Sequence, residues 1–216
     1  MPIRGLACVL VLSVAAAPAF AQEQEEPDAT RLDVERLPPE AISITRELYS
    51  HGVYVEGAVG VRSYIGGVGR LARPGPFFQL NIGYELFSWL WVGGIVEGSL
   101  HRTDAPSPPS ATVFEVLNFL AQLRLQINAS ARVAVWLSGE VGLGLTLSDV
   151  LRTYGLQDAD QAGLVYGGQL GFDWHLRNRH HSIGLAGGAR LHPNLDGVGG
   201  EVAIGAHGTL YLRYVF

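Results

Sequence analysis

The sequence predicts an all-β fold, namely an eight-stranded antiparallel transmembrane β-barrel with a short N-terminal helix or linker. Three observations predict it. Apolar and polar residues alternate along eight segments of residues 52–216, the connections between the segments alternate between short and long, and the apolar face is almost free of charge.

Residues 1–21 have the features of a secretory signal peptide. Arg4 precedes an apolar run over residues 6–17, and the small-residue pattern Ala19-Phe20-Ala21 follows. The run is too short to span a membrane as a helix. Cys8, the one cysteine of the chain, lies within it. Cleavage after Ala21 would therefore leave an exported chain that forms neither a disulfide nor a thiolate metal site.

The sequence of residues 22–51 predicts an acidic, flexible N-terminal segment in the periplasm, which we call the acidic lead. The stretch 22–40 is polar and acidic and ends on Pro38-Pro39, so it offers too little apolar surface to offset its chain entropy. Residues 39–50 follow with a partial apolar face and a proline in the first turn, which is typical of a short helix. A linker and a docked plug are both compatible with this pattern.

Strict alternation of residue character begins after Gly52 and predicts strands with one apolar face. Val53 and Val55, for example, alternate with Tyr54 and Glu56. Each segment is long enough to cross a bilayer at a tilt. The eight segments are residues 53–62, 78–86, 90–101, 113–127, 133–143, 169–176, 183–192 and 201–216.

The connections support the same topology. Short links are expected around Ser88, around 128–130 and around 177–180. Longer links rich in Gly, Pro or Asp are expected at 65–76, 103–110, 146–161 and 193–199. Short turns at one end and longer loops at the other are typical of the periplasmic and external ends of a membrane barrel.

The polar face distinguishes a barrel in lipid from a water-soluble sandwich. In a sandwich this face meets bulk water and carries many long charged side chains, whereas here it carries mainly small or uncharged polar residues. Charge is nearly absent from the other face, where an arginine at mid-depth of a bilayer would cost about 2 to 4 kcal/mol. Six aromatic residues near the predicted turns could form an interfacial girdle: Tyr84, Phe87, Trp89, Trp174, Tyr214 and Phe216.

Charged residues of the polar face are expected to pair inside the narrow lumen. An eight-stranded barrel is just wide enough for its side chains to fill it. Removing one partner of a buried ion pair typically costs about 3 to 5 kcal/mol. The predicted ion-pair network contains Glu56, Arg62, Glu85, Glu97, Arg124, Glu140, Asp173, Arg190, Glu201 and Arg213. Neutral partners are expected from Gln79, Asn81, Gln122, Gln126 and Gln169.

The same alternation predicts that four histidines also point into the lumen: His101, His175, His192 and His207. Histidines and carboxylates together can bind zinc or act as general bases, but the spacing of these four shows no close pair. We therefore predict polar filling of the lumen, with no catalytic residues, no metal and no cofactor.

The last strand carries the most specific pattern. Leu210, Leu212, Tyr214 and Phe216 alternate toward a terminal aromatic residue, which resembles the carboxy-terminal assembly signal of bacterial outer-membrane barrels. Together with the strand count and the loop asymmetry, residues 52–216 resemble the small OmpA and OmpX type of barrel. This resemblance implies an outer-membrane location, contact with outer-membrane lipid, and folding by the barrel assembly machinery.

The net charge of the chain bears on which classes of function are compatible with it. Without Arg4, 14 basic residues, all arginine, stand against 20 acidic ones, a net charge of −6 that argues against nucleic-acid binding. We expect a non-enzymatic structural or interaction component of the cell envelope. The alternatives are a lipid-modifying enzyme and a narrow channel. A signal peptide, an acidic lead and a Gly-rich barrel without lysine also resemble the small outer-membrane components of gliding-motility machinery, which implies a role in a trans-envelope complex with other envelope or motility proteins.

Overall fold

A computed structural model describes residues 52–103, 112–130, 132–157, 159–176, 180–196 and 201–216. The signal peptide, the acidic lead and the helix expected at 39–50 lie outside these residues.

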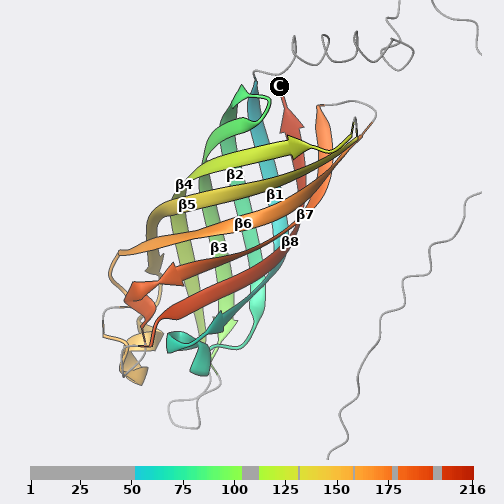
Figure 1. Cartoon of the computed structure of the whole chain (residues 1–216). Helices are drawn as coiled ribbons and strands as arrows, with labels where there is room; N and C mark the ends of the chain where they lie inside the picture. Colours follow the sequence, from blue (N-terminus) through green and yellow to red (C-terminus); the bar gives the residue numbers. More distant parts are fainter. Residues whose placement is uncertain (1–51, 104–111, 131, 158, 177–179, 197–200) are drawn as a thin grey trace, which may run out of the picture. The chain divides into compact units, whose positions relative to one another are not determined.

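Eight antiparallel strands close into a barrel in which each strand pairs with its neighbours in the sequence and β1 pairs with β8 (Figure 1). The predicted fold class is therefore confirmed. Twelve residue pairs join β1 to β8, from Tyr54 opposite Val215 to Ile65 opposite Ile204, so the seam is as complete as the other ladders. The strands are β1 (Val53–Ile65), β2 (Gly75–Phe87), β3 (Leu90–Arg102), β4 (Val113–Asn128), β5 (Val133–Thr146), β6 (Gly163–His175), β7 (His181–His192) and β8 (Ala203–Val215).

The connections alternate in length as predicted. Those after β2, β4 and β6 contain 2, 4 and 5 residues, whereas those after β1, β3, β5 and β7 contain 9, 10, 16 and 10. We call the two ends of the barrel the short-turn end and the long-loop end. Three long connections carry a short 3-10 helix each: η2 (Gly67–Arg70), η3 (Asp149–Tyr154) and η4 (Pro193–Leu195).

The alternation separates an outer apolar surface from a buried interior. On β8, for example, Leu210 and Leu212 are exposed, whereas Tyr211 and Arg213 between them are buried. An apolar surface of this kind is suited to lipid, and closure satisfies the backbone groups that lipid cannot pair. The six aromatic residues expected at the girdle all face outward near the short-turn end. Within the described ranges, no helix combines the length and the apolar character that a membrane span requires.

An apolar cluster lies beneath the long loops, at the long-loop end of the lumen. Val68 of η2, Leu151 of η3 and Leu195 of η4 are fully buried. They pack against side chains that point inward from the strands, including Tyr64 and Phe114. We call this cluster the plug. Its members are Tyr64, Val68, Ala72, Phe114, Val116, Leu151, Leu156, Ala159, Leu195 and Ala203.

Candidate functional site in the barrel lumen

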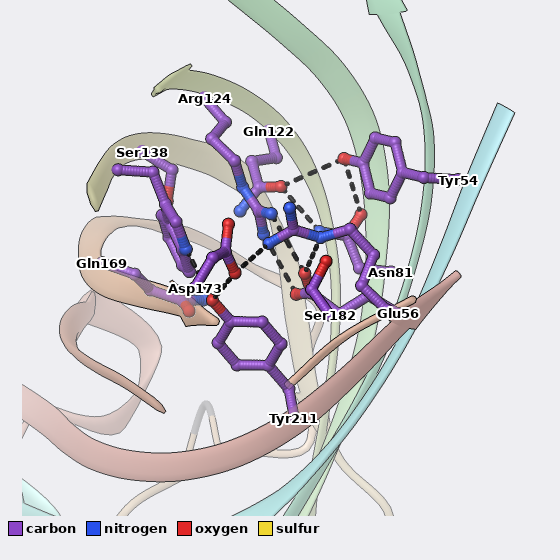
Figure 2. A network of polar contacts seen from close by, with 12 residues as sticks. Tyr54, Glu56, Asn81, Gln122, Arg124, Ser138, Gln169, Asp173, Ser182 and Tyr211 are labelled. Atoms are coloured by element: carbon purple, nitrogen blue, oxygen red, sulfur yellow. Dashed lines mark hydrogen bonds and ion pairs between the residues drawn. The ribbon is translucent and has the colours of Figure 1, made fainter. Parts of the chain in front are cut away.

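The interior nearer the short-turn end holds two carboxylates and two arginines that come from four strands (Figure 2). Arg124 on β4 binds Glu56 on β1 through two hydrogen bonds of 3.0 Å, one to each carboxylate oxygen. Arg213 on β8 donates to the same carboxylate at 2.9 Å and to Asp173 on β6 at 2.7 Å. We call these four residues the lower quartet. Its formal charges cancel.

Aromatic side chains enclose the lower quartet. The Trp136 indole donates to the Tyr211 hydroxyl at 2.7 Å, and that hydroxyl donates in turn to Asp173. The guanidinium carbon of Arg124 lies 3.9 Å from the centre of the Trp136 ring, and that of Arg213 lies 4.7 Å from the centre of the Trp91 ring. Rings at these distances stabilise a desolvated cation through its attraction to their π faces.

A second group of four ionic residues lies between the lower quartet and the plug. Arg62 on β1 binds Glu97 on β3 at 2.5 Å. Arg190 on β7 lies 3.0 Å from Glu97 and 2.8 Å from Glu140 on β5. All four are buried, and their formal charges also cancel. We call them the upper quartet.

Neutral polar side chains extend the hydrogen-bond network of the upper quartet. Gln122 donates to Glu140 of the upper quartet at 3.0 Å. Its amide oxygen accepts hydrogen bonds from Asn81 at 2.6 Å and from Tyr54 at 3.4 Å. A further bond of 3.2 Å links Gln169 to Gln79 across the lumen. The Tyr54–Gln122 and Gln169–Gln79 bonds cross the lumen between strands that are not neighbours in the sheet.

Two balanced quartets explain how so many ions can be buried. A buried ion is tolerated only where a partner and further hydrogen bonds replace its hydration. Glu56 has two arginine partners, and Glu97 has two arginines and the Asn118 amide at 2.6 Å. A buried ionic set of this kind need not add net stability, but removal of one member leaves its partners uncompensated.

The structure brings together eight of the ten residues expected in the lumen network, in the two quartets. Glu85 is also buried on the inward face of β2, nearer the short-turn end. Glu201 was predicted wrongly. Its side chain is 50% exposed and pairs at 2.5 Å with the exposed Arg70. The reason is that β8 begins at Ala203. Glu201 precedes the strand, so the alternation of inward and outward side chains along β8 does not determine its direction.

Sequence reasoning did not identify several inward residues. Ile95, Leu120 and Val165 form a small apolar cluster inside the lumen, although their type suggests the lipid face. The alternation of inward and outward side chains along each strand would have placed them inside.

Among the inward histidines, His207 contacts Arg190 at 2.9 Å, and His101 and His192 flank the ring of Tyr64. Among the described residues, no three His, Cys, Asp or Glu side chains are placed to hold a metal ion.

The assembly-signal residues lie together on the outer face of the last strand. Leu210, Leu212 and Tyr214 face outward on β8, and Phe216 follows with 68% of its surface exposed. The rings of Tyr214 and Phe216 meet edge to face at 4.6 Å.

Comparison with solved structures places this geometry among small outer-membrane barrels. Neisserial surface protein A superposes with a TM-score of 0.57 at 13% sequence identity, over 76% of this chain and 97% of that one. The chain has the fold of a small outer-membrane barrel of the OmpA and OmpX type.

Two further similar structures are weaker matches. OprG from Pseudomonas aeruginosa gives a TM-score of 0.49 at 12% identity, over 78% of this chain and 97% of that one. Ail from Yersinia pestis, solved in complex with a heparin analogue, gives a TM-score of 0.46 at 10% sequence identity, over 76% of this chain and 99% of that one. No protein-family model and no curated relative matches the sequence.

Proposed function

We propose that this protein is a closed, non-enzymatic barrel of the outer membrane that acts as a structural or interaction component of the cell envelope. The observation that carries the proposal is the filled interior. Two ion-paired quartets cross the lumen, and an apolar plug covers them at the long-loop end. An interior filled by side chains is the normal state of an eight-stranded barrel.

Conductance in planar bilayers tests the closed state. We expect purified protein to give no stable current steps, with a known porin as the positive control for insertion. Reproducible steps that change when Arg190 is replaced by glutamine would show that ions pass the upper quartet, and would favour the channel alternative.

Binding falls to the long-loop end in this proposal. Each of η2, η3 and η4 contributes a buried residue to the plug, which holds these segments against the strands. They therefore form a preorganised surface that loses little conformational entropy when a partner binds. Exposed ion pairs decorate this surface, namely Arg70 with Glu201 and Arg152 with Asp160. Loops on a rigid scaffold are the usual place for recognition residues.

The lipid-enzyme alternative finds little support on the outer face. In the described strands, one serine, one carboxylate and one histidine face outward. They are Ser63 near the long-loop end of β1, Glu115 on β4, and His181 at the short-turn end of β7. Their strands, β1, β4 and β7, are not neighbours in the barrel, so on its outer face these side chains do not form a nucleophile with its base. The mass profile of membrane lipid A should be identical with and without the protein, and a changed acylation pattern would favour the enzyme.

The envelope location and the biological process are inferred from the sequence and belong to the same proposal. We infer that the signal peptide is cleaved and that the barrel assembly machinery inserts the mature chain. Fractionation should then recover the protein, beginning at residue 22, in outer membranes. A role in gliding motility rests on the likeness of sequence layout, and a gene deletion tested for motility and envelope integrity examines it.

A further inference from the structure

The ring of His207 on β8 lies between two arginines inside the lumen. Arg190 on the neighbouring strand β7 places its Nη1 atom 2.9 Å from Nε2 and 3.1 Å from Nδ1 of the ring. Arg62 on β1 is directly opposite His207 in the ladder that closes the barrel. Both arginines are fully buried and His207 is 6% exposed, so water and salt screen little of the charge in this place.

This position requires an imidazole ring without charge. A guanidinium group has donors and no acceptor, so a nitrogen of His207 can pair with Arg190 only while that nitrogen carries no proton. An imidazolium has a proton on both nitrogens and would lose the contact. It would also place a third cation beside Arg190 and Arg62, and like charges repel strongly where water is excluded.

The other groups around His207 supply no spare counter-charge. Glu97 on β3 acts on the ring, but its two oxygens already pair with the arginines of β1 and β7. Glu140 on β5 pairs with the same arginine of β7. The remaining titratable group near the ring is His192 on β7, and β2 contributes the neutral Phe77, whose ring centre lies 4.9 Å away.

We propose that the contact between His207 and Arg190 is an acid-sensitive latch in the lumen. With a neutral His207 the upper quartet has no net charge, and Arg190 joins β7 to Glu97 on β3 and to Glu140 on β5. Protonation of His207 adds one positive charge to this enclosed set and displaces Arg190. Acid therefore weakens the ion-paired interior that fills the barrel.

The stability of the barrel should fall with pH because the unfolded chain binds the proton and the folded barrel does not. A histidine in an unfolded chain has a pKa of about 6.5. The contribution of a neutral His207 to stability is therefore complete above about pH 7 and is lost as the pH falls below about 6.5. Each pH unit below that value raises the equilibrium constant for unfolding about tenfold for one such histidine.

Urea unfolding of the full mature chain in detergent micelles, at about pH 7.5 and at about pH 5.5, tests the latch. The quantity of interest is the ratio of the unfolding equilibrium constants at the two pH values. We expect His207→Gln to lower this ratio about tenfold, because the amide oxygen of glutamine can accept from Arg190 but does not bind a proton in this range. A purely structural role for His207 would change stability equally at both pH values, and an unchanged ratio in this variant overturns the proposal.

His181→Gln is the matched control, because it makes the same chemical change at an exposed histidine of β7. It should leave the ratio unchanged within about twofold, and a loss as large as that in His207→Gln overturns the proposal. Nitrogen NMR of the histidine-labelled wild-type barrel at about pH 5.5 tests the same point without a variant. The His207 ring should retain one unprotonated nitrogen, and a doubly protonated ring in the folded barrel overturns the latch.

Discussion

Replacement of Glu56 by glutamine should strongly destabilise the barrel. Glu56 is 2% exposed and receives two hydrogen bonds from Arg124 and one from Arg213. With a neutral amide in its place, two buried arginines would share the single charge of Asp173. Loss of one partner from a buried ionic group costs about 3 to 5 kcal/mol. Urea unfolding in detergent micelles, followed by tryptophan fluorescence, measures this change in the free energy of unfolding.

Glu201→Gln is the matched control, because it makes the same chemical change in an exposed ion pair. Glu201 contacts Arg70 at 2.5 Å, yet both side chains are at least half exposed, so the cost should stay below about 1 kcal/mol. The double variant Glu56→Gln/Arg124→Gln restores charge balance and should be less destabilised than the sum of its single variants by at least about 1 kcal/mol. Equal losses in the Glu56 and Glu201 variants, or strict additivity in the double variant, would refute the charge-balance argument.

Two further predictions concern packing and assembly. Gly171→Ala should lower the free energy of unfolding by about 1 to 3 kcal/mol in the same urea assay, because its new Cβ would come within 2.2 Å of the Trp136 ring. Gly139→Ala, whose Cβ meets nothing within 4 Å, should leave that free energy within about 0.5 kcal/mol, and a loss as large as that of Gly171→Ala would contradict the packing argument. Phe216→Ala should reduce the amount of folded protein in outer-membrane fractions if the terminal aromatic is an assembly signal. Phe87→Ala, another exposed aromatic at the short-turn end, should not, and equal yields from the two variants would argue against the signal.

The sequence determined the barrel through its period of two. Side chains alternate between the faces of any strand, so Val53 and Glu56 received opposite faces without knowledge of the neighbouring strands. Eight such segments with alternating connections were enough for the topology, and the interior position of nine of the ten predicted charged residues followed from parity. Glu201 was assigned wrongly because parity has no meaning beyond the end of a strand, and alternation does not mark that end.

Tertiary structure alone decided which charges meet. Glu56 and Arg213 are 157 residues apart, and their contact depends on the closure of β1 on β8 and on the stagger between strands. The same closure divides eight ions into two neutral quartets. It also brings Val68, Leu151 and Leu195 of three separate loops into one plug. Local sequence fixes which way a side chain points, whereas its partner depends on the register of strands far apart in the chain, and no local pattern encodes that register.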